Sequence, residues 1–344
     1  MRAVALRDQE LHVRDDVAEP TPETGQVLVA VKACGICGSD LHFAKHAAEM
    51  KAIGEEMGGL PMRLPSADLT QDVFMGHEFA AEVLAAGPNT ATFAPGTLVT
   101  SVPMLMSGFG VSAIGFGNAP PAGYGERMLL SAPLLQEVPN GLDARRAALT
   151  EPMAVGLHAV NKARLEPGDG TIVLGCGPVG LAVIAALRQR GVDTILAADF
   201  SPARRALAAT MGASQVIDPA SESAFDIWLT DHGTKPPVVF EAVGVTGMID
   251  AVLRDVVPQT RVVVVGVCMG RDPITPLWAI TKELNLQFVL GYDLEEFAAS
   301  LRSIAEGEID VDPLITGEVG LDGVAGAFDD LGNPDRHCKI LVTP

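Results

Sequence analysis

The chain has 344 residues, enough for about two domains, and 48% of them are hydrophobic, so large buried cores are available. Acidic side chains outnumber basic ones by 43 to 24, and the formal net charge is −19. Because such a surface repels phosphate backbones and anionic lipid, we expect neither nucleic acid nor membrane as a partner. The cysteines follow no disulfide spacing, and neither a signal peptide nor a membrane-spanning run is visible, so we expect a cytoplasmic protein.

The first third of the chain predicts short strands. Apolar residues alternate at 27, 29 and 31, and Gly/Pro turns separate further strand-like runs up to about residue 100, which is typical of a small β-barrel. Residues 43–72 interrupt this pattern with a helical and loop segment broken by prolines. We expect this segment to cover one side of an active-site cleft and to influence substrate size, with a surface decoration as the alternative. Residues 101–125, rich in Met, Phe and Gly, are either a core loop or an apolar wall of that cleft.

Reactive side chains gather in this part of the chain. A thiol, a hydroxyl, two imidazoles and two carboxylates stand at Cys37, Ser39, His42, His77, Glu78 and Glu151. Taken singly, each reads as a buried small residue or a satisfied polar one. Taken together, thiolate, imidazole and carboxylate are donors that suit zinc, and three protein ligands with a fourth position for water would make the site catalytic.

From Thr171 onward, strands alternate with helices, which predicts a doubly wound parallel sheet. A buried strand ends at a glycine-rich turn, and a helix opens there with Pro178 and Val179. The turn and its acidic partner at the end of the second strand form a dinucleotide-binding fingerprint: Gly175, Gly177, Gly180 and Asp199. Asp199 favours NAD over NADP because it would accept from the ribose hydroxyls and repel a 2′-phosphate. Arg204 and Arg205 count against that preference, since arginines can accommodate the phosphate.

In this order and over nearly the whole chain, the motifs resemble the zinc-dependent medium-chain dehydrogenases of the alcohol dehydrogenase superfamily. The Glu151-Pro152 segment looks most like the branch of sorbitol, threonine and butanediol dehydrogenases, because liver-type alcohol dehydrogenases carry a cysteine where Glu151 stands. The resemblance implies an α/β fold in which a GroES-like β-barrel catalytic domain (1–150 and 292–344) is split by a Rossmann NAD-binding domain (151–291).

The resemblance also assigns residues. Cys37 and His77 would bind one catalytic zinc, and Glu78 or Glu151 would complete the set directly or through water. Ser39 and His42 would pass the proton towards solvent by way of the cofactor ribose. The residues expected along the cofactor are Gly175, Gly177, Pro178, Val179, Gly180, Asp199, Arg204, Val243, Val265 and Gly266.

The reaction implied is hydride transfer between an alcohol and NAD, with zinc acidifying the alcohol as a Lewis acid. We expect a secondary alcohol, a diol or a polyol as substrate. Relatives often hold a second, structural zinc on four cysteines near residues 100–115, and this chain has none there, so we expect no structural zinc. The alternatives are a zinc-free quinone or enoyl reductase and a non-catalytic dinucleotide-binding protein. A homodimer or homotetramer is expected, because residues 276–290 match a region that pairs subunits in relatives.

Overall fold

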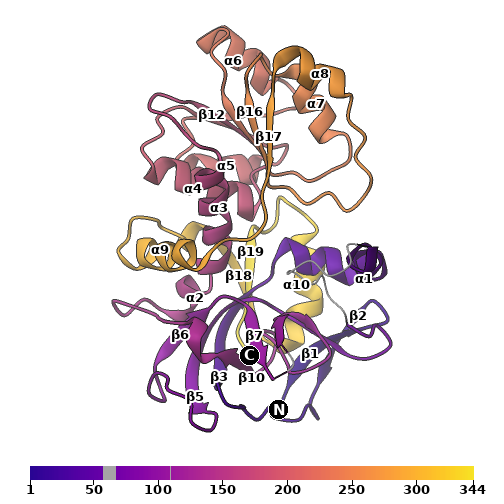
Figure 1. Ribbon diagram of the computed structural model, residues 1–344, viewed down its shortest axis with the longest axis vertical. Helices are drawn as coiled ribbons and strands as arrows, with labels where there is room; N and C mark the ends of the chain where they lie inside the picture. Colours follow the sequence, from indigo (N-terminus) through magenta and orange to yellow (C-terminus); the bar gives the residue numbers. More distant parts are fainter. Residues whose placement is uncertain (57–66, 109) are drawn as a thin grey trace.

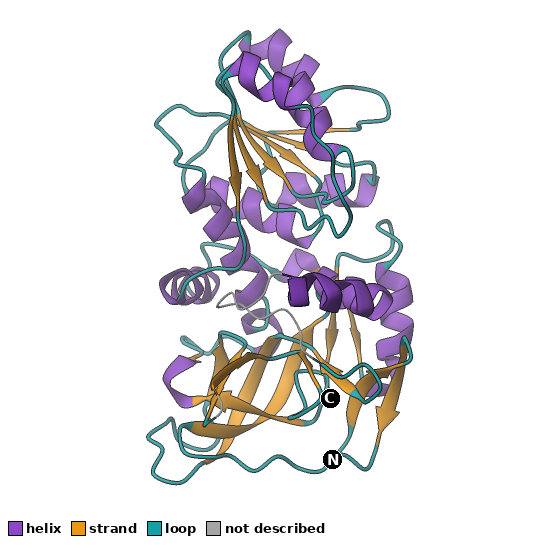
Figure 2. Ribbon diagram, turned by 45° about the vertical axis from the view of Figure 1, so that its right-hand side comes forward, coloured by secondary structure: helices purple, strands orange, loops and turns teal. Residues whose placement is uncertain are grey.

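The computed structural model describes residues 1–56, 67–108 and 110–344, which fold into two lobes joined end to end (Figure 1). Within these residues the first lobe holds three β-sheets, and the second holds one parallel sheet flanked by helices. Figure 2 shows helices lying between the strands of the two lobes. The α/β class predicted from the sequence is confirmed. No helix in the described ranges is long and apolar enough to cross a membrane.

Two sheets of the first lobe enclose its core. One has the order β2-β1-β4-β9, formed by Glu10–Arg14, Ala3–Arg7, Val73–Met75 and Phe116–Gly117. The other has the order β11-β6-β5-β3-β19-β18, formed by Leu135–Glu137, Leu98–Ser101, Glu78–Ala86, Gln26–Gly35, Lys339–Val342 and Ile315–Val319, with β10 (Arg127–Ser131) also paired to β3. A small hairpin joins β7 (Met104–Ser107) to β8 (Gly110–Ala113). The alternating apolar residues of β3 are buried in this core, as their spacing predicts.

The last strand of the chain completes the first lobe. β19 pairs antiparallel with β3, placing Val342 opposite Cys34 and Leu341 opposite Gly35. On its other side β19 pairs parallel with β18. The C-terminal tail therefore returns to the sheet built by the N-terminal third, and Lys339 begins the strand between β3 and β18.

The second lobe is a six-stranded parallel sheet in the order β14-β13-β12-β15-β16-β17. Its strands are Gln215–Ile217, Ile195–Ala198, Thr171–Leu174, Val238–Glu241, Arg261–Val264 and Asn285–Phe288. The inner strands β13, β12 and β15 are buried along their whole length, which explains why all their residues but Thr171 and Glu241 are apolar. The strand order reverses beside β12, and a ligand crevice lies at the carboxyl ends of the strands at such a switch point.

Helices cover both sheets and connect the lobes. They are α1 (Gly38–Glu56), α2 (Ala144–Ala147), α3 (Thr150–Lys162), α4 (Pro178–Gln189), α5 (Pro202–Thr210), α6 (Ala224–His232), α7 (Met248–Asp255), α8 (Pro276–Lys282), α9 (Leu294–Ala305) and α10 (Val324–Leu331). Short 3₁₀ turns cover Ala132–Leu134, Asp312–Leu314 and Leu321–Gly323. Helix α3 packs closely on α4, because Gly156 has no side chain: a Cβ there would lie 2.6 Å from the Ala182 Cβ.

Several element boundaries bear on the later argument. Residues 321–331 form a 3₁₀ turn followed by α10. Strand β16 ends at Val264, and the N–H groups of Val265 and Gly266 both donate to the carbonyl of Glu241. The described first part of segment 43–72 belongs to α1, with a kink at His46, whereas residues 57–66 lie outside the described residues.

Candidate active site

The reactive segment 37–42 lies where β3 ends and α1 begins. The carboxylate of Asp40 reaches back to accept from the backbone N–H of Cys37 at 2.9 Å. This is the return half of a capping box, and it fixes the turn that carries the thiol. Cys37 and Ser39 are half-buried at the mouth of this turn.

His77 stands in the link between β4 and β5 and is 8% exposed. Its Nε2 lies 3.3 Å from the Ser39 hydroxyl, and its Nδ1 lies 3.4 Å from the Asp40 Oδ1. The Cys37 thiol is also within hydrogen-bond reach of the ring. Burial lowers the pKa of His77, but the charges of Asp40 and Cys37 outweigh burial and hold it well above its usual value. A carboxylate behind the ring orients the imidazole, as in histidine metal ligands.

Asp40 is a residue that the sequence reading did not single out. Its carboxylate is fully buried and accepts from the Tyr124 hydroxyl at 2.6 Å as well as from Cys37. Tyr124 in turn packs against Gly76, where a Cβ would come within 2.8 Å of the ring and where φ is +99°. Only glycine therefore fits before His77. The signal for Asp40 was its place three residues after Cys37, in the first turn of a helix.

Glu78 follows His77 but faces a different partner. Both of its carboxylate oxygens accept from Lys339 Nζ, at 2.8 and 2.7 Å, and the two side chains are buried. Burial lowers the pKa of Lys339, but Glu78 outweighs it and keeps the ammonium charged. No local sequence pattern predicts this ion pair, because its two partners lie 261 residues apart.

Glu151 lies in the first turn of α3, and its carboxyl group interacts electrostatically with His77. Burial raises the pKa of Glu151 to about 7, whereas His77 and a hydrogen bond from Tyr292 act in the opposite direction. Tyr292, which the sequence did not indicate, lies just before α9 and stacks against Phe297 at 5.6 Å between ring centroids. The segments entering and leaving the second lobe therefore meet at Glu151.

The donors suit zinc in kind. Cys37 and His77 are neighbours and Glu151 interacts with the imidazole, which brings together a thiol, an imidazole and a carboxylate. Across residues 1–56, 67–108 and 110–344, no three Cys, His, Asp or Glu side chains are drawn together tightly enough to enclose an ion. The polar atoms Asp40 Oδ1 and His77 Nδ1 are buried without a well-aligned hydrogen bond. A metal ion bound to the imidazole would strengthen the contact between His77 Nδ1 and Asp40 Oδ1, because it would make the ring N–H a better donor.

His42 lies further along α1, on its exposed side. Burial lowers the pKa of His42, and the nearby charges of His46 and Lys45 lower it further. The structure thus places His42 among other cationic groups at the solvent side, whereas Ser39 contacts His77 directly.

The glycine-rich turn has the geometry that the fingerprint requires. Gly175 adopts φ +89°, and a Cβ there would lie 2.9 Å from the carbonyl of Ala242. A Cβ at Gly180 would lie 1.9 Å from the carbonyl of Gly175, so helix and turn need this glycine to pack. A Cβ at Gly177 would lie 4.0 Å from its nearest neighbour, a nitrogen of the Arg204 guanidinium, so there is open space beside the start of α4. Pro178 and Val179 open that helix, whose free N–H groups can face a pyrophosphate.

Asp199 lies at the end of β13 beside this turn. Its carboxylate accepts from the backbone N–H groups of Cys176 and Ser201, both at 2.8 Å. Arg204 approaches the same carboxylate at 3.9 Å, whereas Arg205 donates to the backbone carbonyl of Asp199 at 2.8 Å and pairs with Asp218 at 3.1 Å. The acidic group is therefore held in place, with both arginines close to Asp199.

The neighbouring strand ends complete the crevice. Val243 is 39% exposed, and Val265 and Gly266 follow β16 at the same edge of the sheet. Glu241 shapes this edge: its carboxylate accepts from the N–H groups of Val243 and Gly244 at 2.7 and 2.8 Å. No motif in the sequence predicts this function for Glu241, which is buried at the end of β15.

Comparisons with known proteins agree with this arrangement. Residues 23–140 match the alcohol dehydrogenase GroES-like domain, and residues 178–306 match the zinc-binding dehydrogenase domain. The (R,R)-butanediol dehydrogenase of Bacillus subtilis (strain 168) is 31% identical over 100% of both chains. This chain belongs to the zinc-dependent medium-chain dehydrogenases. It is an oxidoreductase acting on CH–OH groups, and its first lobe is the GroES-like domain predicted from the motifs.

Solved structures of other medium-chain dehydrogenases have the same fold. The crystal structure of 2R,3R-butanediol dehydrogenase from Bacillus subtilis gives a TM-score of 0.83 at 30% identity, covering 100% of this chain and 99% of that one. A zinc-binding dehydrogenase from Sinorhizobium meliloti 1021 with NADP bound gives the same TM-score at 27% identity and the same coverage.

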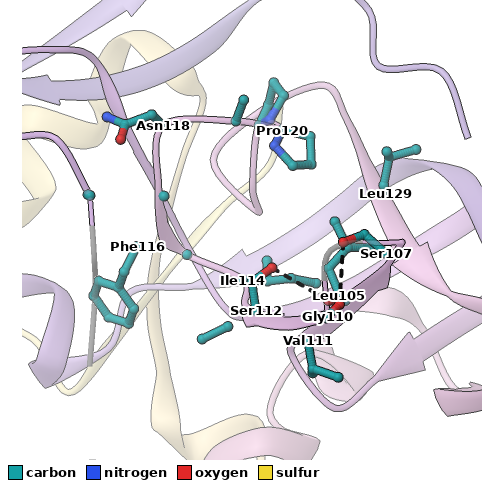
Figure 3. Close-up of a pocket in the computed structure, with 16 residues that line it drawn as sticks. Leu105, Ser107, Gly110, Val111, Ser112, Ile114, Phe116, Asn118, Pro120 and Leu129 are labelled. Carbon is teal, nitrogen blue, oxygen red and sulfur yellow. Dashed lines mark hydrogen bonds between the residues drawn. The ribbon is translucent and has the colours of Figure 1, made fainter. Parts of the chain in front are cut away.

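In this dehydrogenase, segment 101–125 lines a cavity of about 490 Å³ in the first lobe (Figure 3). Leu105, Ile114 and Phe116 contribute apolar surface, and Asn118 adds a polar group. Phe116 also reaches the reactive residues: its ring centroid lies 5.3 Å from that of His77 and 5.1 Å from that of Phe43. Phe116 and Phe43 therefore connect the cavity wall and α1 to the site.

Proposed function

We propose that this enzyme oxidises a secondary alcohol, diol or polyol with NAD, using one zinc ion held by Cys37, His77 and a carboxylate. The observation that carries the proposal is the position of Ser39, Asp40 and Cys37 around the buried ring of His77. The similarity to butanediol dehydrogenase over the whole chain supports the substrate class. When bound, zinc would supply Lewis acidity to the substrate hydroxyl, and NAD would accept the hydride.

The protein side chains have separate tasks in this scheme. Asp40 holds the imidazole of His77 in one orientation and fixes the turn of Cys37. Ser39 would relay the proton of the substrate hydroxyl by releasing its own proton as it accepts that one, and His42 at the exposed side of α1 would deliver the proton to solvent. Phe116 excludes water beside the ring and limits the space for substrate.

NAD is the proposed cofactor because Asp199 ends the second strand of the sheet and is held beside the glycine-rich turn. The NADP-bound relative and the nearby Arg204 both favour the other cofactor, NADP. The preference is therefore measured by comparing activity with NAD and with NADP. We place the division between the catalytic and NAD-binding domains at residues 150 and 292, where α3 and the segment before α9 cross between the lobes.

We also propose a homo-oligomer paired through the outer edge of the parallel sheet. Strand β17 is the last in the sheet order, and apolar side chains crowd this edge: Leu277, Ile280, Phe288 and Leu290 are each 61–70% exposed. An exposed sheet edge beside such a patch fits a second copy of the chain. A cytoplasmic location is proposed as well, since all five cysteines are free thiols and a reducing compartment keeps them so.

The decisive experiment combines metal analysis with a substrate panel. The purified protein should contain about one zinc per chain and reduce NAD with polyols, vicinal diols or secondary alcohols. Cys37→Ser should lose zinc and nearly all turnover, because a hydroxyl replaces a thiolate poorly. Glu151→Ala should impair zinc retention or turnover more than Asp231→Ala on the surface of α6. Full activity in metal-free protein would end the zinc mechanism.

A further inference from the structure

The hydroxyl of Ser201 connects the cofactor crevice of the second lobe with the tail of the first. Ser201 is 4% exposed and is the N-cap of α5, where its oxygen accepts from the backbone N–H of Arg204 at 3.2 Å. Its single proton goes the other way, to the carboxylate of Asp335 at 2.5 Å. Asp335 stands on the turn 333–336 between α10 and β19, so this contact joins the two lobes.

The turn presents Asp335 in a defined position. The side-chain oxygen of Asn333 accepts from the N–H of Asp335 at 3.0 Å, and the carbonyl of Asn333 accepts from the N–H of Arg336 at 3.1 Å. An asparagine that bonds the backbone two residues on stabilises such a turn locally. The carbonyl of Pro334 also lies 3.3 Å from the Ser201 oxygen, but it is a weaker acceptor than a charged carboxylate. The Ser201 proton is therefore directed to Asp335.

Ser201 also contacts both charged residues of the cofactor crevice. Its backbone N–H donates to Asp199 Oδ1 at 2.8 Å, and its hydroxyl oxygen holds the N–H of Arg204. Because a hydroxyl has one proton, its commitment to Asp335 leaves the oxygen lone pairs for Arg204. Without Asp335, the buried hydroxyl would turn to other acceptors, and the start of α5 would lose part of its cap. The placement of Asp199 and Arg204 thus depends on a carboxylate from the other lobe.

We propose that Asp335 is a positioning residue for cofactor binding, which holds the Ser201 hydroxyl and through it the Asp199 carboxylate and the start of α5. This inference rests on the proposed binding of NAD in the crevice of the second lobe. Asp335 acts by accepting a proton, which an uncharged oxygen in the same place also does. Cofactor affinity is then a property of both lobes.

NADH affinity measures this effect directly. The NADH dissociation constant, from the fluorescence of NADH bound to the zinc-loaded protein, should be compared for Asp335→Ala and Asp335→Asn. We expect Asp335→Ala to raise it about fivefold or more, because Asp199 is less well ordered before binding. KM for NAD should rise in parallel, with kcat changed by less than about twofold. Asp335→Asn keeps an oxygen acceptor and should raise the constant by less than about twofold. Equal losses in the two variants would overturn the inference, because they would show that the charge acts and the hydrogen bond does not.

Ser201→Ala tests the same link from the second lobe. It should weaken NADH binding at least as much as Asp335→Ala does, and the double variant Ser201→Ala/Asp335→Ala should bind no more weakly than Ser201→Ala alone, because the two residues act through one hydrogen bond. Additive losses would contradict this coupling. Asp329→Ala is the matched control, since Asp329 is an exposed carboxylate on α10 in the same tail. Its NADH dissociation constant should equal that of the unmodified protein.

The outcomes also distinguish this inference from the function on which it rests. An unmodified protein that binds neither NADH nor NADPH would overturn the proposed cofactor and the inference together. Normal NADH binding in the unmodified protein and an unchanged dissociation constant in folded Asp335→Ala would overturn the inference alone. If Asp335→Ala does not fold, Ser201→Ala and Asp335→Asn still decide: the first should weaken NADH binding and the second should not.

Discussion

Asp199 is the residue on which cofactor choice depends. Two backbone N–H groups hold its carboxylate in place, so the side chain is already ordered before the cofactor ribose binds. We expect a preference for NAD over NADP of at least ~10-fold in kcat/KM, or about 1.4 kcal/mol. Asp199→Ala should erode it, as measured by steady-state kinetics with both cofactors.

The control for this change is Asp193→Ala, whose side chain is 96% exposed in the same domain. It should leave the cofactor ratio unchanged. Equal or better turnover of the unmodified enzyme with NADP would contradict the assignment and point to Arg204, 3.9 Å from the carboxylate.

Glu151 makes stability depend on pH in the metal-free protein. Burial raises its pKa to about 7 in the folded state, whereas an unfolded chain releases this proton near pH ~4.3. Between these values the folded state holds a proton that the unfolded state has lost, so the free energy of unfolding falls as pH rises. In EDTA, metal-free Glu151→Gln should gain about 2 kcal/mol relative to the unmodified protein between pH 5 and pH 8.

Urea unfolding at the two pH values measures this gain. Asp231→Asn, on exposed α6, should show no such change between pH 5 and pH 8. A constant difference between the unmodified protein and Glu151→Gln at both pH values would show that the carboxyl titrates as in the unfolded chain.

For single residues, the sequence predicts which side chains belong to the site better than it predicts the contacts that position them. Residue type and spacing identified Cys37, His77 and Asp199 as candidate site residues. The links that position them are long-range: Asp40 with Tyr124 spans 84 residues, and Glu78 with Lys339 spans 261. Such pairs depend on which strands become neighbours, and local patterns do not contain that information.

Among the elements, buried strands and glycine turns were the most predictable. β12, β13 and β15 read as strands because continuous apolar runs are needed where both faces of a sheet are covered. The two-residue strand β9 was not predictable, because its two residues have no periodicity and form a strand only through pairing with β4.

The edge formed by β17 and α8 carries the prediction on assembly. Ile280 is 70% exposed on α8, in the apolar patch proposed to meet a second copy. Ile280→Glu should shift the mass measured by light scattering towards the 35.9 kDa of one chain, because it would bury an unpaired charge at the interface. Leu229→Glu, 42% exposed on α6, is the matched control and should keep the original mass. A monomeric unmodified protein at micromolar concentration would contradict this pairing.

The chain as a whole is joined at the proposed metal site. Cys37 follows β3, His77 precedes β5, and Glu151 opens α3, the helix that leads towards the second lobe. The resemblance predicted that the C-terminal tail returns to the first lobe, and the pairing of β19 with β3 shows this return. How the two lobes meet at Glu151 and Tyr292 could not be read from either half alone.

Metal removal should therefore destabilise the whole molecule. A ligand that binds only the folded state adds about 4 kcal/mol when its free concentration exceeds Kd by ~1000-fold. We expect chelation to remove about one zinc per chain and to lower Tm, and zinc addition to restore it. In Cys37→Ser, chelation should change Tm little, because the thiolate ligand is already lost. About two zinc ions per chain would reveal a structural site, and an unchanged Tm in the unmodified protein after complete zinc removal would mean that the three segments are not held together by a metal.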